Sequence, residues 1–83
     1  MTNIDNRSLT NKIGEVVTSM GGSFTYEDVM EKVKIKFPDD IGNLSDSELL
    51  MKIQSSINML KLAKVVRVED FYISNAWKER AFL

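Results

Sequence analysis

The sequence predicts a mainly helical α+β domain, in which a core of three helices is followed by a C-terminal β-hairpin and a short terminal helix. Apolar residues recur at helical spacing over three stretches between residues 9 and 62, and the pattern changes to that of β-strands after Ala63. Glycine, proline and capping residues separate these stretches. The 83 residues suffice for one hydrophobic core. We therefore expect a single domain over residues 1–83, in which residues 1–7 are frayed, residues 8–73 form the core and residues 74–83 form a C-terminal segment.

The first helix is expected to start after Ser8, because serine is a favourable N-cap residue. The pair Gly21-Gly22 ends it, because glycine adopts the left-handed conformation of a helix C-cap without steric cost. The apolar residues between these signals fall on one face of a helix: Leu9, Ile13, Val16, Val17 and Met20.

The second helix follows Ser23-Phe24, which is long enough only for a minimal strand. Thr25 with Asp28 is close to the capping-box pattern that starts a helix. Pro38 ends the helix, since the residue before a proline is pushed out of the helical region. The apolar stripe of this helix consists of Tyr26, Val29, Met30, Val33 and Phe37. The acidic stretch over residues 39–43 is typical of a loop.

The third helix has the clearest local signal, because Ser45 and Glu48 form a capping box and the helix then continues to about Leu62. Leu44 and Leu49 stand where a hydrophobic staple would be. The inner face is expected to contain Leu49, Leu50, Ile53, Ile57 and Leu60. At 100° per residue, the outward positions are Glu48, Met51, Ser55, Asn58, Met59 and Leu62.

The rest of the chain changes to β-forming residues. Residues 64–68 and 71–73 are rich in valine, isoleucine and aromatic residues, and only Glu69-Asp70 separates them, which predicts a hairpin. Ser74 is expected to cap a short final helix that carries Trp77, Ala81 and Phe82.

This order of elements resembles that of winged helix-turn-helix domains over residues 8–73. Residues 23–29 (SFTYEDV) correspond to the minimal strand and the start of the second helix, and residues 53–73 to the third helix and the wing. The resemblance implies that the third helix enters the major groove of DNA. The loop over residues 39–43 is longer than the turn of a tight helix-turn-helix motif. This difference counts against the geometry that reads DNA more than it counts against the winged-helix fold.

The composition argues against an enzyme and against a metal or cofactor site. The chain has no cysteine and no histidine, so thiolate or imidazole nucleophile pairs and the commonest metal ligands are excluded. Its paired carboxylates adjoin helix starts, loops and turns, where acidic residues serve as caps. The sequence also lacks the patterns of a signal peptide and of a membrane span, and we expect a cytoplasmic protein.

The leading functional prediction is a small regulatory or accessory module that binds a protein partner, such as a component of transcription or replication machinery, or a second copy of itself. Three outward residues of the third helix, Met51, Met59 and Leu62, are apolar, and something is expected to bury them. One explanation is that the C-terminal segment covers them with Trp77, Phe82 and Leu83. The other is a partner, and the predicted interface is then Met51, Ser55, Met59, Leu62 and Trp77. The small size also suits a phage or mobile-element regulator.

The alternative prediction is a dimeric DNA-binding transcriptional regulator. Residues 51–68 include four basic residues and no acidic one, and the predicted nucleic-acid contacts are Lys52, Lys61, Lys64 and Arg67. Two observations oppose it. The net charge is −1 with a pI near 5.3, and Asp46 and Glu48 place negative charge at the start of the third helix, which would repel phosphate.

Overall fold

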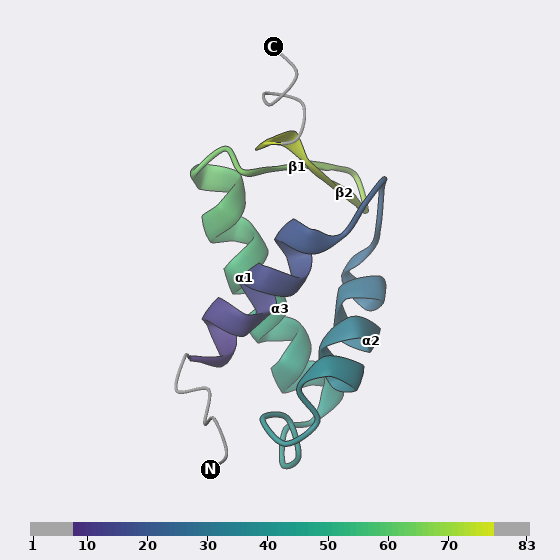
Figure 1. The fold of residues 1–83 in the computed structure, drawn as a ribbon, viewed down its shortest axis with the longest axis vertical. Helices are drawn as coiled ribbons and strands as arrows, with labels where there is room; N and C mark the ends of the chain where they lie inside the picture. Colours follow the sequence, from purple (N-terminus) through teal and green to yellow (C-terminus); the bar gives the residue numbers. More distant parts are fainter. Residues whose placement is uncertain (1–7, 78–83) are drawn as a thin grey trace.

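The computed structural model describes residues 8–77 and confirms a mainly helical α+β fold (Figure 1). Within that range the helices α1 (Leu9–Ser19), α2 (Tyr26–Lys36) and α3 (Asp46–Leu62) precede the strands β1 (Val66–Glu69) and β2 (Tyr72–Asn75). The two strands pair antiparallel. Three helices followed by such a hairpin are compatible with a winged-helix-like arrangement.

The three helices start where the sequence predicts, because each start is stabilised by a local cap. The hydroxyl of Ser8 accepts a backbone N–H bond from the first turn of α1. Thr25 with Asp28, and Ser45 with Glu48, form capping boxes in which each side chain accepts the backbone N–H of the other residue. Each box satisfies two backbone donors that a bare helix start would leave unpaired.

The predicted helix ends are also close to those observed. α1 ends at Ser19, and Gly22 has a positive φ of 64° in the connection that follows. α2 ends at Lys36, two residues before Pro38. In Figure 1, α1 crosses in front of α3, while α2 lies beside both helices.

The residue that follows the C-cap of α3 is a lysine, in a position where glycine is the usual residue. Lys64 has a positive φ of 62°. Its N–H donates to the carbonyl of Lys61 at 3.0 Å, and the N–H of Val65 donates to the carbonyl of Leu60 at 2.9 Å. These two bonds make up a Schellman motif, whose left-handed residue is most often glycine.

The core forms where the inner faces of the helices meet the hairpin. Its fully or almost fully buried residues include members of every predicted apolar stripe, and partly buried residues such as Leu9, Tyr26 and Leu60 pack around them. The buried apolar residues are Ile13, Val16, Val17, Phe24, Val29, Val33, Leu49, Ile53, Ile57, Val66 and Ile73.

The hairpin lies across one end of the helices, at the top of Figure 1. Its register pairs Glu69 with Tyr72, so the turn residues are Asp70-Phe71 and the predicted turn at Glu69-Asp70 is wrong by one residue. Asp70 takes a positive φ of 55°, which aspartate tolerates better than most residues. The predicted minimal strand is confirmed, since Phe24 and Ile73 form an antiparallel bridge with backbone bonds of 2.9 and 2.7 Å.

The predicted cap of the terminal helix is wrong. Ser74 lies inside β2, paired with Arg67, and so does not cap a helix there. Most of the predicted terminal helix, with Ala81 and Phe82, lies outside the described residues.

Two buried polar side chains connect elements that are distant in the sequence, and the sequence analysis identified neither. The Asn75 amide donates to the carbonyls of Val17 and Met20 at 3.0 and 2.7 Å, at the end of α1. The Lys12 ammonium lies 2.9 Å from a carboxylate oxygen of Asp40. It also lies 5.4 Å from the centre of the Phe37 ring, a cation–π distance. The loop after α2 is therefore held against α1 by Lys12.

Candidate interaction surface

The outward side of α3 presents the exposed apolar surface that the sequence predicts. We define the outer face of α3 as Met51, Ser55, Met59 and Leu62. The exposed fractions of its apolar members are 67% for Met51, 63% for Met59 and 75% for Leu62, and Ser55 is exposed as well. Because these residues are spaced by four, four and three positions, they form one stripe along the helix.

Two shallow hollows border this stripe where α1 crosses α3. Met51 and Ser55 line one of about 390 Å³, and Met59 lines another of about 530 Å³. Thr10 of α1 borders both. Beside these hollows α1 and α3 approach closely, and the Ser56 hydroxyl donates to the carbonyl of Thr10 at 3.0 Å. The structure therefore brings Met51, Ser55 and Met59 together on a surface that α1 partly walls.

Trp77, the fifth predicted interface residue, lies away from these hollows. Its backbone N–H donates to the carbonyl of Val65 at 3.1 Å, which places it just beyond the C-terminal end of α3. Its side chain is 43% exposed. The other residues expected to cover the outer face, Phe82 and Leu83, lie outside the described residues.

Three of the four predicted nucleic-acid contacts gather at the other end of α3. Lys61, Lys64 and Arg67 line a hollow of about 300 Å³ between the end of α3 and the hairpin, and no acidic residue is among its lining residues. Lys52 is separate, since it lines the hollow beside Met51. Glu69 lies two residues after Arg67 on the same face of β1, so it offsets part of the positive charge.

The start of α3 carries the negative charge that the sequence indicates. Asp46 forms an exposed ion pair with Lys34 at 2.7 Å, and the Glu48 carboxylate is engaged in the capping box. The two ends of α3 therefore differ in charge, with carboxylates at the first turn, Lys61 in the last turn and Lys64 just after the C-cap.

The exposed apolar surface on α2 was missed in the sequence analysis. Ile35 is 79% exposed on α2 and lines a hollow of about 580 Å³ between α2 and the end of α1, together with Lys32 and Met20. Helical periodicity could have indicated this exposure. Ile35 stands about 200° around the helix from the inward Val33, so it points away from the inner stripe.

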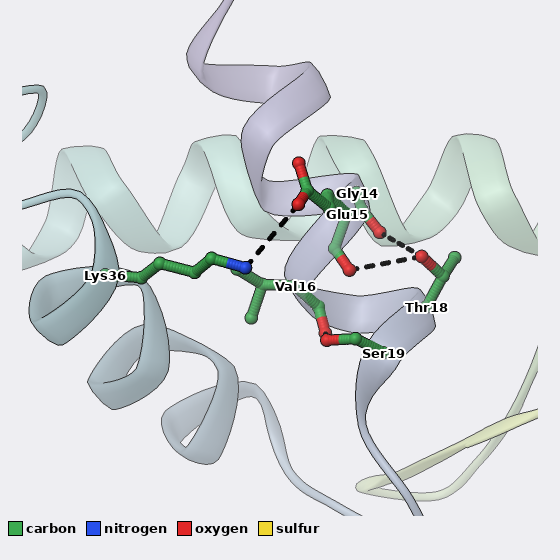
Figure 2. A network of polar contacts seen from close by, with 6 residues as sticks. All are labelled: Gly14, Glu15, Val16, Thr18, Ser19 and Lys36. Atoms are coloured by element: carbon green, nitrogen blue, oxygen red, sulfur yellow. Dashed lines mark hydrogen bonds and ion pairs between the residues drawn. The ribbon is translucent and has the colours of Figure 1, made fainter. Parts of the chain in front are cut away.

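Polar contacts beside this hollow hold the end of α1 (Figure 2). The Lys36 ammonium lies 3.5 Å from a carboxylate oxygen of Glu15, joining α2 to α1. The Thr18 hydroxyl donates to the carbonyls of Gly14 and Glu15, and the Ser19 hydroxyl to that of Val16. The hydroxyl bonds are local to α1 and the Lys36–Glu15 pair is exposed. We therefore interpret these contacts as stabilising the C-terminal part of α1.

Neither a metal centre nor a spanning helix is found in the part of the chain that the structure describes. Over residues 8–77, no three side chains of His, Cys, Asp or Glu come together as a metal site would require. The helices in that range also lack the length and apolarity needed to cross a bilayer.

Comparisons with known proteins place the chain in no family. No protein-family model matches it, and no curated protein or solved structure is significantly similar to it.

Proposed function

We propose that this chain is a winged-helix-like binding module that docks on another protein through the outer face of α3. The observation that carries the proposal is the exposed stripe of Met51, Met59 and Leu62 on a helix whose opposite side is buried. Large apolar side chains gathered on one exposed face favour association, because covering them removes apolar surface from water.

The arrangement of elements supports the winged-helix part of this proposal. The bridge between Phe24 and Ile73 adds the segment before α2 to the edge of the hairpin. The order is therefore helix, minimal strand, helix, helix and hairpin, which is that of a winged helix-turn-helix domain. In such a domain α3 is the helix available to a partner.

The chemistry of the outer face favours a protein over a nucleic acid. Its four residues carry no charge, and the nearby first turn of α3 carries Asp46 and Glu48. Phosphate contacts need cationic or hydrogen-bond donating groups, whereas methionine adapts its flexible side chain to irregular apolar surfaces. We propose a partner with an apolar patch of its own, such as a component of transcription or replication machinery.

Site-specific photo-crosslinking tests this proposal. Benzoyl-phenylalanine in place of Leu62, a large and 75% exposed residue of the same face, should give a discrete covalent adduct in cells that produce the protein, and the same group in place of the exposed Glu31 on α2 should not. Met51→Glu with Met59→Glu should abolish the adduct. Both side chains are exposed, so the far-ultraviolet circular dichroism should stay unchanged.

Ile35→Glu is the matched control, because it adds a carboxylate at an exposed apolar residue on another helix. It should leave the adduct intact. Equal adducts from positions 62 and 31, or none from position 62, would show that the outer face of α3 is not the docking surface.

A DNA-binding regulator is the second candidate, and the hollow lined by Lys61, Lys64 and Arg67 favours it. These side chains could contact backbone phosphates, and such contacts weaken steeply as salt rises. The acidic first turn of α3 and the neighbouring Glu69 make this candidate weaker than the first.

Fluorescence anisotropy with labelled duplex DNA, at low and near-physiological salt, tests the second candidate. Lys64→Ala with Arg67→Ala should weaken binding and reduce its salt dependence. Lys32→Ala with Lys36→Ala removes the same charge from α2, leaves the Lys34–Asp46 pair intact and should have little effect. Binding that is equal in the two double variants, or absent at low salt, would exclude the hollow as a phosphate site.

A further inference from the structure

We propose that the occupant of the outer face of α3 is a second copy of this chain, whose α3 packs antiparallel to the first across a two-fold axis beside Ser55. This inference rests on the proposed function, since it names the partner of the same face. It follows from the spacing of the stripe and from the charges at the two ends of α3.

The two methionines of the outer face have the spacing that a two-fold interface requires. In such an interface, if one residue contacts another, the reverse contact occurs as well. Met51 and Met59 each stand four residues from Ser55, or about 6 Å along the helix. With Ser55 facing its own copy, Met51 of each chain faces Met59 of the other. Both apolar contacts form at once.

The small central residue suits close packing of the two helices. Helix axes approach to about 8–10 Å, and the approach depends on the side chains at the crossing point. Ser55 is the smallest residue of the outer face, and it is flanked on both sides by exposed methionines. The methionines can therefore fold around the crossing point and exclude water there.

The charges at the ends of α3 favour the antiparallel direction. Glu48 lies on the outer side of the first turn, whereas Asp46 points to the other side and pairs with Lys34. Lys61 lies in the last turn and Lys64 follows the C-cap. Antiparallel packing places the acidic end of one helix beside the basic end of the other, and it also opposes the two helix dipoles. Parallel packing would place like charges together. A second copy thus supplies both the apolar patch and the complementary charges.

The absence of cysteine allows a direct test, because a single introduced cysteine is then the only thiol in the chain. Ser55→Cys should form a disulfide-linked dimer under mild oxidation, since residues on the axis meet their own copies. Ser47→Cys is the matched control on the same helix, and it is exposed too. Its two copies would lie about 24 Å apart along the helices, beyond the reach of a disulfide.

A mixture of two variants tests the register. Met51→Cys mixed with Met59→Cys should give a cross-linked heterodimer. Either variant alone should give about tenfold less dimer, because each residue lies roughly 12 Å along the helix from its own copy. Sedimentation velocity of the unmodified chain should show a reversible dimer that Met51→Glu with Met59→Glu removes. The two methionine side chains per copy form a small apolar core, so we expect association in the micromolar range or weaker.

The outcomes separate this inference from the proposed function. Equal cross-linking of Ser55→Cys and Ser47→Cys, or cross-linking of Met51→Cys to itself, would overturn the antiparallel pair. A photo-adduct from position 62 to a different protein, with Ser55→Cys remaining monomeric, would overturn the second copy as partner and leave the proposed function standing. If position 62 gives no adduct of any kind, both fail.

Discussion

The inner and outer faces of α3 belong to one helix but are built for different surroundings. Leu49, Ile53 and Ile57 on the inner face are buried completely or almost so, whereas Met51 and Met59 on the outer face are about two-thirds exposed. Both faces are apolar. A helix that only needs to cover a core usually has a polar outer side, so the apolar outer face of α3 is not required by the fold.

The two faces also differ in the kind of apolar residue. The inner face uses leucine and branched isoleucine, which have few rotamers and pack to a fixed shape. The outer face uses two methionines, whose flexible side chains adapt to a surface that forms only on binding. The difference teaches that the inner face specifies the fold, while the outer face is suited to a contact with something else.

The largest expected effect comes from truncating one residue on each face. Ile53→Ala should lower the free energy of unfolding by about 2–5 kcal/mol, because it leaves a cavity in a closely packed core. Met51→Ala should change it by about 0.5 kcal/mol or less, since the side chain is mostly in water. Urea unfolding followed by circular dichroism measures both. Comparable losses would mean that the outer face also supports the fold of the single chain.

A smaller effect distinguishes the adjacent serines Ser55 and Ser56. Ser56 is buried and donates to the carbonyl of Thr10, while Ser55 is exposed. Ser56→Ala should cost about 0.5–1.5 kcal/mol through the lost hydrogen bond. Ser55→Ala should be neutral or slightly stabilising, because alanine has the higher helix propensity. The same urea titration applies, and equal values for the pair would remove the assigned role of the Ser56 bond.

The smallest effect concerns the C-terminal end of α3, where both faces stop. Lys64 holds a positive φ of 62° in the Schellman motif, and glycine takes that conformation without strain. Lys64→Gly should therefore raise the free energy of unfolding by about 0.5–1 kcal/mol. Lys61→Gly, inside the last turn of α3, should lower it by about 1 kcal/mol. A loss of stability in Lys64→Gly would show that its side chain contributes more than its backbone costs.

Local signals explain the parts of the fold that the sequence predicted well. The helix starts at Ser8, Thr25 and Ser45 depend on residues within one turn, so they can be recognised without tertiary information. The outward positions of α3 follow from helical periodicity and a single inward reference, Ile53.

Features that depend on distant residues were not predictable in the same way. The partners Lys12 and Asp40 are 28 positions apart, and nothing in the charge pattern of the loop selected that pairing. The hairpin register was wrong by one residue because its turn contains neither glycine nor asparagine, and aspartate at position 70 takes the positive φ instead. The gathering of Lys61, Lys64 and Arg67 depends on how the hairpin folds back on α3.

The Asn75 amide has a consequence for how the chain opens and closes. It joins the end of β2 to the carbonyls of Val17 in α1 and of the C-cap Met20, which lie 58 and 55 positions earlier, so the end of α1 is completed by one of the last described residues. Such a bond can form only after most of the chain has been brought together. We expect the amide protons at the end of α1 and those of the hairpin to exchange with solvent in a single cooperative opening event. The N-terminal helix would then reach its final stability late in folding, although its own capping signals are local.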